Sequence, residues 1–455
     1  MKKTKFTLII FQLALTISVP QAAKAEAAAK MFDGGDVVCF IGDSITHSGT
    51  WHVHVQNYYL TRFPERHIEM YNCGIGGHTA EKTLVNFGWD VTPRRPSQAV
   101  IMLGMNDLRK AGTDSEVWQD YISRMKELSN LIKTETDAHI TWISPSPYDD
   151  MLELELKPLQ GFSDLLNRTS QELKAFAAEN NGSYIDFNQP MNRINLKRKQ
   201  TDPEFTLIGG DRIHPGALGN MVMAYLFLTA QEAPATVSRA GISAAEGILF
   251  EGNCKINIKT RSFDRIAFTI KAKALPFPMP EETFAALGIV PIEKELNQEI
   301  LQVTELDTGS YTVTIDNKIV GRFTNSELEQ GINLAYNKNT PQYIQSQEIA
   351  RLSEEKRKIE FKLRTESMLK VLLSLHGIEF DGNDRTNVYA MFDREEVKEL
   401  FAPGGKFSSG GALRYWKRYQ AEKQSLHTAQ REIKEIISAI YKINMPREHR
   451  YEIKK

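Results

Sequence analysis

Four short motifs in this chain carry side chains that together could perform acyl transfer. Ser44 lies in Gly-Asp-Ser-Ile-Thr, Gly77 in a glycine-rich stretch, Asn106 in Gly-Met-Asn-Asp and His214 in Asp-Arg-Ile-His-Pro. A serine hydroxyl becomes a nucleophile when a neighbouring base removes its proton, and histidine has an unperturbed pKa near neutrality. The residue types therefore predict Ser44 as a nucleophile and His214 as its general base.

A carboxylate is needed to orient the histidine ring. Asp211 precedes His214 by three residues, so we expect it to accept the Nδ1 proton and leave Nε2 facing Ser44. Asp186 and Asp202 are alternative partners, but Asp211 is preferred for its spacing.

Acyl transfer also needs hydrogen-bond donors for the negative oxygen of the tetrahedral intermediate. The backbone N–H groups of Ser44 and Gly77 and the side-chain amide of Asn106 are predicted to form this oxyanion hole. Asp107, next to Asn106, is expected to hold the loop without entering the chemistry.

The motifs follow short apolar runs that read as strands, separated by stretches with helical periodicity. Strands are predicted at 37–41, 68–72, 99–103, 139–143 and 183–187, and helices at 52–62, 79–86, 115–132, 161–179 and 216–228. This alternation predicts an α/β domain with a three-layer parallel sheet. Polar groups at the carboxyl ends of such strands face one crevice, so the four motifs should converge there.

The four motifs, in this order and spacing, resemble the conserved blocks of the SGNH (GDSL-type) hydrolases over residues 36–230. The resemblance implies a flavodoxin-like sheet, no metal or cofactor, and ester hydrolysis through an acyl-serine intermediate. It also implies that Gly42 and Asp43 shape the turn that presents Ser44. Ile45 stands where the family name has Leu, as in carbohydrate esterase members, and Gly76 and His78 replace the commoner Ser and Asp around Gly77.

His47, Trp51 and His78 lie near the motifs and are predicted to line the substrate cleft, because aromatic and imidazole side chains suit a sugar. An alternative is a metal site formed by these histidines with His52 and His54. No carboxylate or cysteine accompanies them at ligand spacing, so no metal is expected.

The sequence character changes after the predicted hydrolase domain, residues 32–232. Strand-like stretches, including a hairpin at 311–323 that turns at Asp316-Asn317, predict a small β-rich module at 236–330. Residues 340–455 read as charged helices whose apolar stripe needs a partner surface, so we expect them to pack back on the hydrolase domain and wall one side of the cleft.

The first 25 residues are typical of a cleaved export signal, with Lys2, Lys3 and Lys5, an apolar run and Ala23-Lys24-Ala25. The run of about 14 apolar residues is shorter than a bilayer requires, so a secreted or periplasmic protein without a membrane span is expected. A formal net charge of −1 and scattered basic residues argue against a nucleic-acid partner. Cys39 and Cys73 are expected to be buried free thiols.

These observations predict a secreted carboxylic-ester hydrolase, an acetylesterase acting on a carbohydrate. A lysophospholipase or general lipid esterase is the alternative enzyme, and it would need an apolar acyl groove. An alternative of another class is a glycan-binding protein with an inactive site. The substrate is expected to be a small-molecule or glycan ester, and the oligomeric state stays open.

Overall fold

The computed structural model describes residues 28–110, 115–155, 157–380 and 385–455. The predicted export signal lies outside these residues. Among them, a central parallel sheet has the strand order β2-β1-β3-β4-β5. Its strands are β1 (Val37–Gly42), β2 (Glu69–Gly74), β3 (Gln98–Met102), β4 (His139–Ile143) and β5 (Ser183–Ile185). This order is that of the flavodoxin-like fold, which confirms the predicted fold class.

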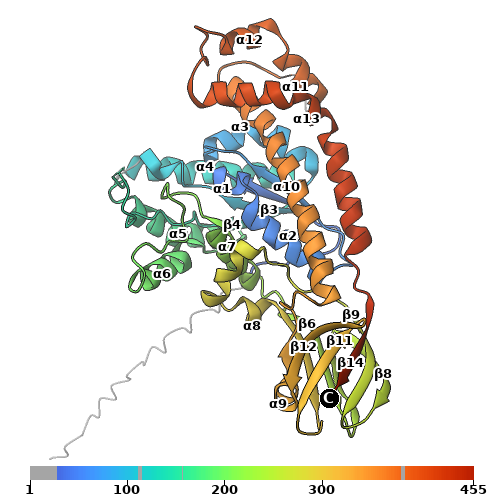
Figure 1. The fold of residues 1–455 in the computed structure, drawn as a ribbon. Coiled ribbons are helices and arrows are strands. Elements are labelled where there is room, and N and C mark those ends of the chain that lie inside the picture. The colour runs from blue at the N-terminus through green and yellow to red at the C-terminus, as the bar shows by residue number, and fades with distance from the viewer. Residues whose placement is uncertain (1–27, 111–114, 156, 381–384) are drawn as a thin grey trace, which may run out of the picture.

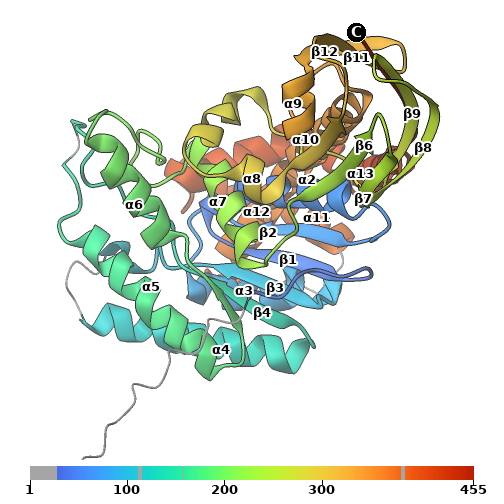
Figure 2. The same cartoon turned by 90° about the horizontal axis from the view of Figure 1, so that it is seen from below.

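Helices cover both faces of this sheet (Figures 1 and 2). α1 (Ser44–His47) follows β1, and α2 (Thr50–Arg62) packs with α7 (Ala217–Ala230) on one face. α3 (Ala80–Asp90) packs with α4 (Ser115–Glu135) on the other, while α5 (Phe162–Glu179) lies against β4 and β5 and beside α6 (Asn188–Lys199). Short 3₁₀ turns occupy Thr92–Arg94 and Leu108–Lys110.

The β-rich module consists of two further sheets, with strand orders β13-β10-β6-β7 and β12-β11-β14-β9-β8. The strands are β6 (Thr236–Ser243), β7 (Gly247–Gly252), β8 (Cys254–Arg261), β9 (Arg265–Ala272), β10 (Gln298–Thr304), β11 (Ser310–Ile315), β12 (Lys318–Thr324), β13 (Ile332–Asn333) and β14 (Glu448–Lys454). The predicted hairpin is β11–β12, and Asp316 and Asn317 both have positive φ, as its tight turn requires.

Two segments differ from the predicted organisation. The helical prediction to residue 455 is wrong at its end, because β14 forms a strand between β9 and β11 of the β-rich module. A segment within 273–297, inside the predicted β-rich module, instead packs on the hydrolase core. It contains the 3₁₀ helix η3 (Glu281–Gly288) and α8 (Ile292–Leu296), which lie against α7. A short helix, α9 (Asn325–Gln330), follows β12.

The remaining helices form a long arm beside the α/β domain (Figure 1). α10 (Pro341–Ser374) runs up and α13 (Gly410–Ile443) runs back antiparallel to it, with α11 (Arg385–Phe392) and α12 (Glu395–Phe401) at the far end. α10 packs on α2, α3 and β2. Across the described ranges, no helix is both long and apolar enough to cross a bilayer.

Side chains of this arm bond to the outer edge of β2, the edge strand beside β1. Lys356 Nζ donates to the Met70 carbonyl at 3.1 Å, and Arg364 Nε donates to the Gly74 carbonyl at 3.0 Å. The Arg364 guanidinium also donates to the Asp90 carboxylate from both terminal nitrogens, and both residues are buried. The arm thus covers a strand edge that would otherwise present unpaired main-chain groups.

Arg364→Met is expected to lower the free energy of unfolding by about 3 kcal/mol, because it leaves a buried carboxylate with less compensating charge. Arg94, 3.3 Å from Asp90, remains as a weaker partner. Urea unfolding would measure the loss. The matched control is Arg351→Met, on the exposed side of α10, where little change is expected. A loss for Arg364→Met no larger than the control's would contradict the role of this ion pair.

Candidate active site

Ser44 is presented by a tight turn between β1 and α1. The Asp43 carboxylate caps α1 by accepting the Ile45 N–H at 2.9 Å. A Cβ on Gly42 would lie 2.4 Å from Thr46 Oγ1 and 2.7 Å from the Met102 carbonyl, so only glycine fits there. These contacts place Ser44 at the first position of α1, partly exposed at the carboxyl end of β1.

His214 lies against this serine. The distance between Ser44 Oγ and His214 Nε2 is 2.6 Å, and His214 Nδ1 bonds to Asp211 Oδ2. The other carboxylate oxygen of Asp211 accepts the backbone N–H of Ile213 at 3.0 Å and that of His214 at 2.9 Å. The loop thus fixes its own carboxylate, and the ring tautomer with hydrogen on Nδ1 leaves Nε2 to accept the serine proton.

Among the three candidate aspartates, the structure pairs His214 with Asp211. Asp186 is engaged elsewhere, accepting from Ser144 and Ser170 at 2.8 Å each. In the described part of the chain, Asp202 makes no hydrogen bond to the ring of His214. Partial burial pushes the pKa of Asp211 upward, but the hydrogen bonds from His214 outweigh it and hold the pKa below its usual value. The carboxylate is therefore charged at neutral pH.

The three predicted oxyanion donors follow the carboxyl ends of β1, β2 and β3, at the same edge of the sheet. Gly77 has φ of 73°, a left-handed conformation that favours glycine. Asn106 Nδ2 donates one hydrogen to the His78 carbonyl at 3.0 Å, which orients the amide and leaves its second hydrogen for another acceptor. As the first residue of α1, Ser44 has a backbone N–H with no acceptor inside the helix.

Asp107 connects the loop of Asn106 to the segment that follows Gly77. Its carboxylate accepts the Ala80 N–H at 2.7 Å, at the start of α3, and the Gly104 N–H at 3.1 Å. Burial raises its pKa to about 6. This arrangement agrees with a loop-holding role.

The three residues predicted to line the cleft lie in the interior instead. His47, Trp51 and His78 are 5%, 1% and 2% exposed. Trp51 packs edge-on against Phe40 and Phe187 in the hydrophobic core. Their burial argues against direct substrate contact, because a surface cleft cannot reach them.

His47 instead supports the loop that carries Gly77. Its Nδ1 accepts the Gly76 N–H at 3.1 Å, so the ring hydrogen is on Nε2, which faces the Phe361 carbonyl of α10 at 3.4 Å. Burial, with Arg364 nearby, lowers the pKa of His47 to about 3, and that of His78 likewise. Both rings therefore stay neutral over the working range of an esterase.

Two residues near this loop were not predicted. A Cβ on Gly76 would lie 3.1 Å from the Tyr415 hydroxyl and 3.8 Å from Met368 Cε, so α13 and α10 reach the edge of the site. Both residues lie in charged helical stretches of the sequence, and no motif there indicates a role at the site. The contact supports the expectation that the helices wall one side of the cleft.

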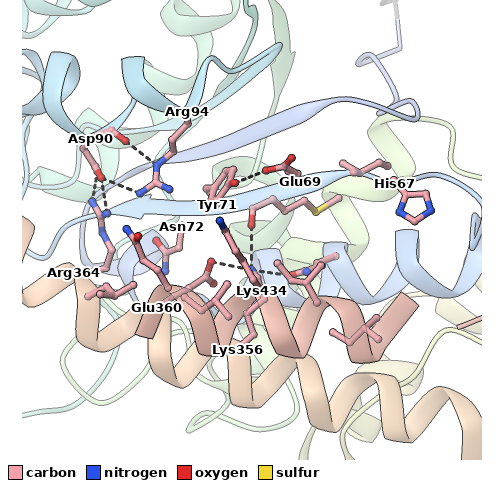
Figure 3. A pocket seen from close by; sticks show the side chains of 18 of the residues that line it. His67, Glu69, Tyr71, Asn72, Asp90, Arg94, Lys356, Glu360, Arg364 and Lys434 are labelled. Atoms are coloured by element: carbon pink, nitrogen blue, oxygen red, sulfur yellow. Dashed lines mark hydrogen bonds and ion pairs between the residues drawn. The ribbon is translucent and has the colours of Figure 1, made fainter. Parts of the chain in front are cut away.

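A small hollow of about 230 Å³ adjoins His214. Ser48 and Thr50 line it from one side, and Pro215 and Asn220 from the other. A larger cavity, about 790 Å³, lies between β2 and the helical arm, and none of the four motif residues lines it (Figure 3). The chemistry is therefore separate from the larger cavity.

Residues 40–222 match the model of the GDSL-like lipase/acylhydrolase family. The structure of a gut microbial diltiazem-metabolizing enzyme is 30% identical, with a TM-score of 0.81, and the match covers 94% of this chain and 99% of that one. This chain belongs to the GDSL-like family. It is an ester hydrolase or acylhydrolase, and the long match shows that its β-rich module and helical arm are shared with that relative.

Within this family, an acetylxylan esterase from Geobacillus stearothermophilus is 26% identical over 226 residues, which cover 43% of this chain and 93% of the relative. A crystal structure of an acetylxylan esterase from the same organism is 23% identical, covering 44% of this chain and 95% of that one, with a TM-score of 0.37.

Ser44→Ala and His214→Ala are each expected to lower kcat on a small acetate ester by about a thousandfold or more, since each removes one half of the proton-transfer pair. Asp211→Asn should cost less, because the serine-histidine contact remains. Steady-state kinetics measure the three variants, and circular dichroism checks their folding. If Ser44→Ala kept more than a tenth of the activity, the nucleophile would be a different residue.

Burial raises the pKa of Asp43 from 3.8 to about 7. Between about pH 4 and pH 7, the folded protein keeps a proton on Asp43 that the unfolded chain loses. This group therefore makes the free energy of unfolding fall as the pH rises across that range, with no further change above pH 7. Asp43→Asn should lack this fall. The fall in the free energy of unfolding due to Asp43 is at most about 4 kcal/mol, because one pKa unit is worth about 1.4 kcal/mol.

Urea unfolding of wild type and Asp43→Asn at pH 5 and pH 8 tests this. Other raised carboxyls, such as Asp107, are common to both proteins, so the difference between the two isolates Asp43. An identical pH dependence of the two would contradict the raised pKa.

Proposed function

We propose that this protein is a secreted serine acetylesterase that removes O-acetyl groups from a carbohydrate. Ser44 acts as nucleophile, His214 as general base and then acid, and Asp211 orients the ring. The observation that carries the proposal is the continuous hydrogen-bond chain from Ser44 through His214 to Asp211 beside three potential oxyanion donors.

The proposed reaction has two matched steps. His214 Nε2 takes the Ser44 proton as Oγ bonds to the acetyl carbon, and the negative oxygen is held by the N–H groups of Ser44, Gly77 and Asn106. The sugar oxygen then leaves with the proton from His214, giving acetyl-Ser44. Water, deprotonated by His214, attacks this ester, and acetate departs as Ser44 regains its proton.

The surroundings of His214 support a polar alcohol and a small acyl group. The leaving oxygen must receive its proton from Nε2, so the alcohol lies on the His214 side, where Ser48, Thr50 and Asn220 line the 230 Å³ hollow. On the other side, Tyr415 and Met368 crowd the loop at Gly76. This crowding suits an acetyl group better than a long chain.

The relatives are consistent with an acetate ester. One is named an acetylxylan esterase, and the relative matched over 99% of its length is described as a diltiazem-metabolizing enzyme. The predicted export signal supports a substrate outside the cytoplasm.

We expect 4-nitrophenyl acetate to be cleaved with a kcat/KM at least about tenfold above the butyrate, and the octanoate to be nearly inert, because a tight pocket discriminates by about 1–3 kcal/mol per methylene. The same protein should release acetate from acetylated xylo-oligosaccharides, measured by an acetate assay, and Ser44→Ala should not.

Other outcomes point to the alternatives. Activity that rises toward octanoate would favour a lipid esterase. Binding of the glycan by a well-folded wild type without release of acetate, and without cleavage of any ester, would favour a glycan-binding protein with an inactive site.

A further inference from the structure

The cavity between the sheet and the helical arm has the size of a small-molecule site. Its volume is about 790 Å³, within the usual range for such sites. β2 forms one wall and α10 and α13 the opposite one, as Figure 3 shows. Exposed Gln430 and Lys434 of α13 lie along its opening.

One wall presents main-chain donors and acceptors. In β2 the N–H and C=O of alternate residues point away from β1. Three outward positions are occupied: Tyr441 bonds to Ile68, Lys356 to Met70 and Arg364 to Gly74. Among the described residues, however, no hydrogen bond is made by the backbone N–H of Met70 or by the N–H and C=O of Asn72. These groups are available to a bound molecule.

Most of the charged side chains in the cavity are paired with one another, and Lys434 at the opening adds a further positive charge. Lys356 pairs with Glu360 at 2.8 Å, and Arg364 pairs with Asp90, which Arg94 also contacts. Figure 3 shows these pairs projecting between the helices and the strand. A charged ligand would therefore have to compete with existing pairs, whereas a neutral ligand with several hydroxyls would not.

The opposite wall is partly apolar. Ile433, Ile437 and Ile440 of α13 face the cavity, and Trp89 and Tyr71 add aromatic surface. A ligand that matches both walls has hydroxyls on its rim and C–H groups on its faces, which is the surface of a neutral sugar ring.

We propose that this cavity is a second ligand site, separate from Ser44, that binds a neutral mono- or disaccharide. The hydroxyls bond to the open edge of β2, and the ring packs against the isoleucines of α13. The site lies outside the hydrolytic machinery, so it does not depend on which ester the enzyme cleaves.

Isothermal titration calorimetry with Ser44→Ala protein and unacetylated xylose, xylobiose and glucose tests the proposal, with glucuronate as the charged comparison. At least one neutral sugar should bind saturably and more tightly than glucuronate. Gln430→Trp, which fills the opening, should weaken this binding at least tenfold. Arg431→Trp, on the neighbouring exposed position that does not line the cavity, should leave it unchanged.

Lys434→Trp provides a second block, and circular dichroism reports that each variant is folded. Absence of sugar binding, tighter binding of glucuronate, or binding that survives both blocking variants would overturn the proposal. Because the titration involves no hydrolysis, either proposal can fail while the other stands.

Discussion

The outer edge of β2 is the constraint around which this molecule is organised. β2 is an edge strand directly beside β1, whose carboxyl end leads into the turn that presents Ser44. The carboxyl end of β2 leads into the loop of Gly77. Side chains from α10 and α13 bond to this edge where a further strand would otherwise pair. These bonds join side chains of the helices to the main chain of β2, whereas a further strand would pair with the whole edge. The edge is therefore only partly covered, and the space that remains is the 790 Å³ cavity.

The same cover reaches the catalytic loops. Arg364 bonds to Gly74 immediately before the oxyanion loop, and the Phe361 carbonyl faces the ring of His47, which in turn holds Gly76. Ser44 and His214, the proposed nucleophile and base, lie within the α/β domain, whereas the Gly77 loop is supported by a helix about 290 residues later in the chain. An arm that is remote in sequence is therefore part of the support of the active site.

The sequence indicates which candidate catalytic residues lie together, because parallel strands bring their carboxyl ends to one edge of the sheet, so motifs after successive strands must meet. Ser44, His214 and Asp211 are in contact for this reason. The cleft lining was harder to predict, since histidine and tryptophan near a site can face substrate or pack inside. His47 and Trp51 are buried by partners from α10 and α7 that local pattern cannot reveal. β14 and the segment within 273–297 were misplaced for the same reason.

The position of β14 has a consequence for the biogenesis of the protein. Its residues 448–454 pair with β9 around residues 265–271 and with β11 at residues 312–315. β9 and β11 flank it in the same sheet, so that sheet has a gap at its centre until the last strand arrives. Residues 448–454 must therefore be synthesised before the module can close. Pairing across such long separations is slow, so this sheet should form late in the folding of the chain.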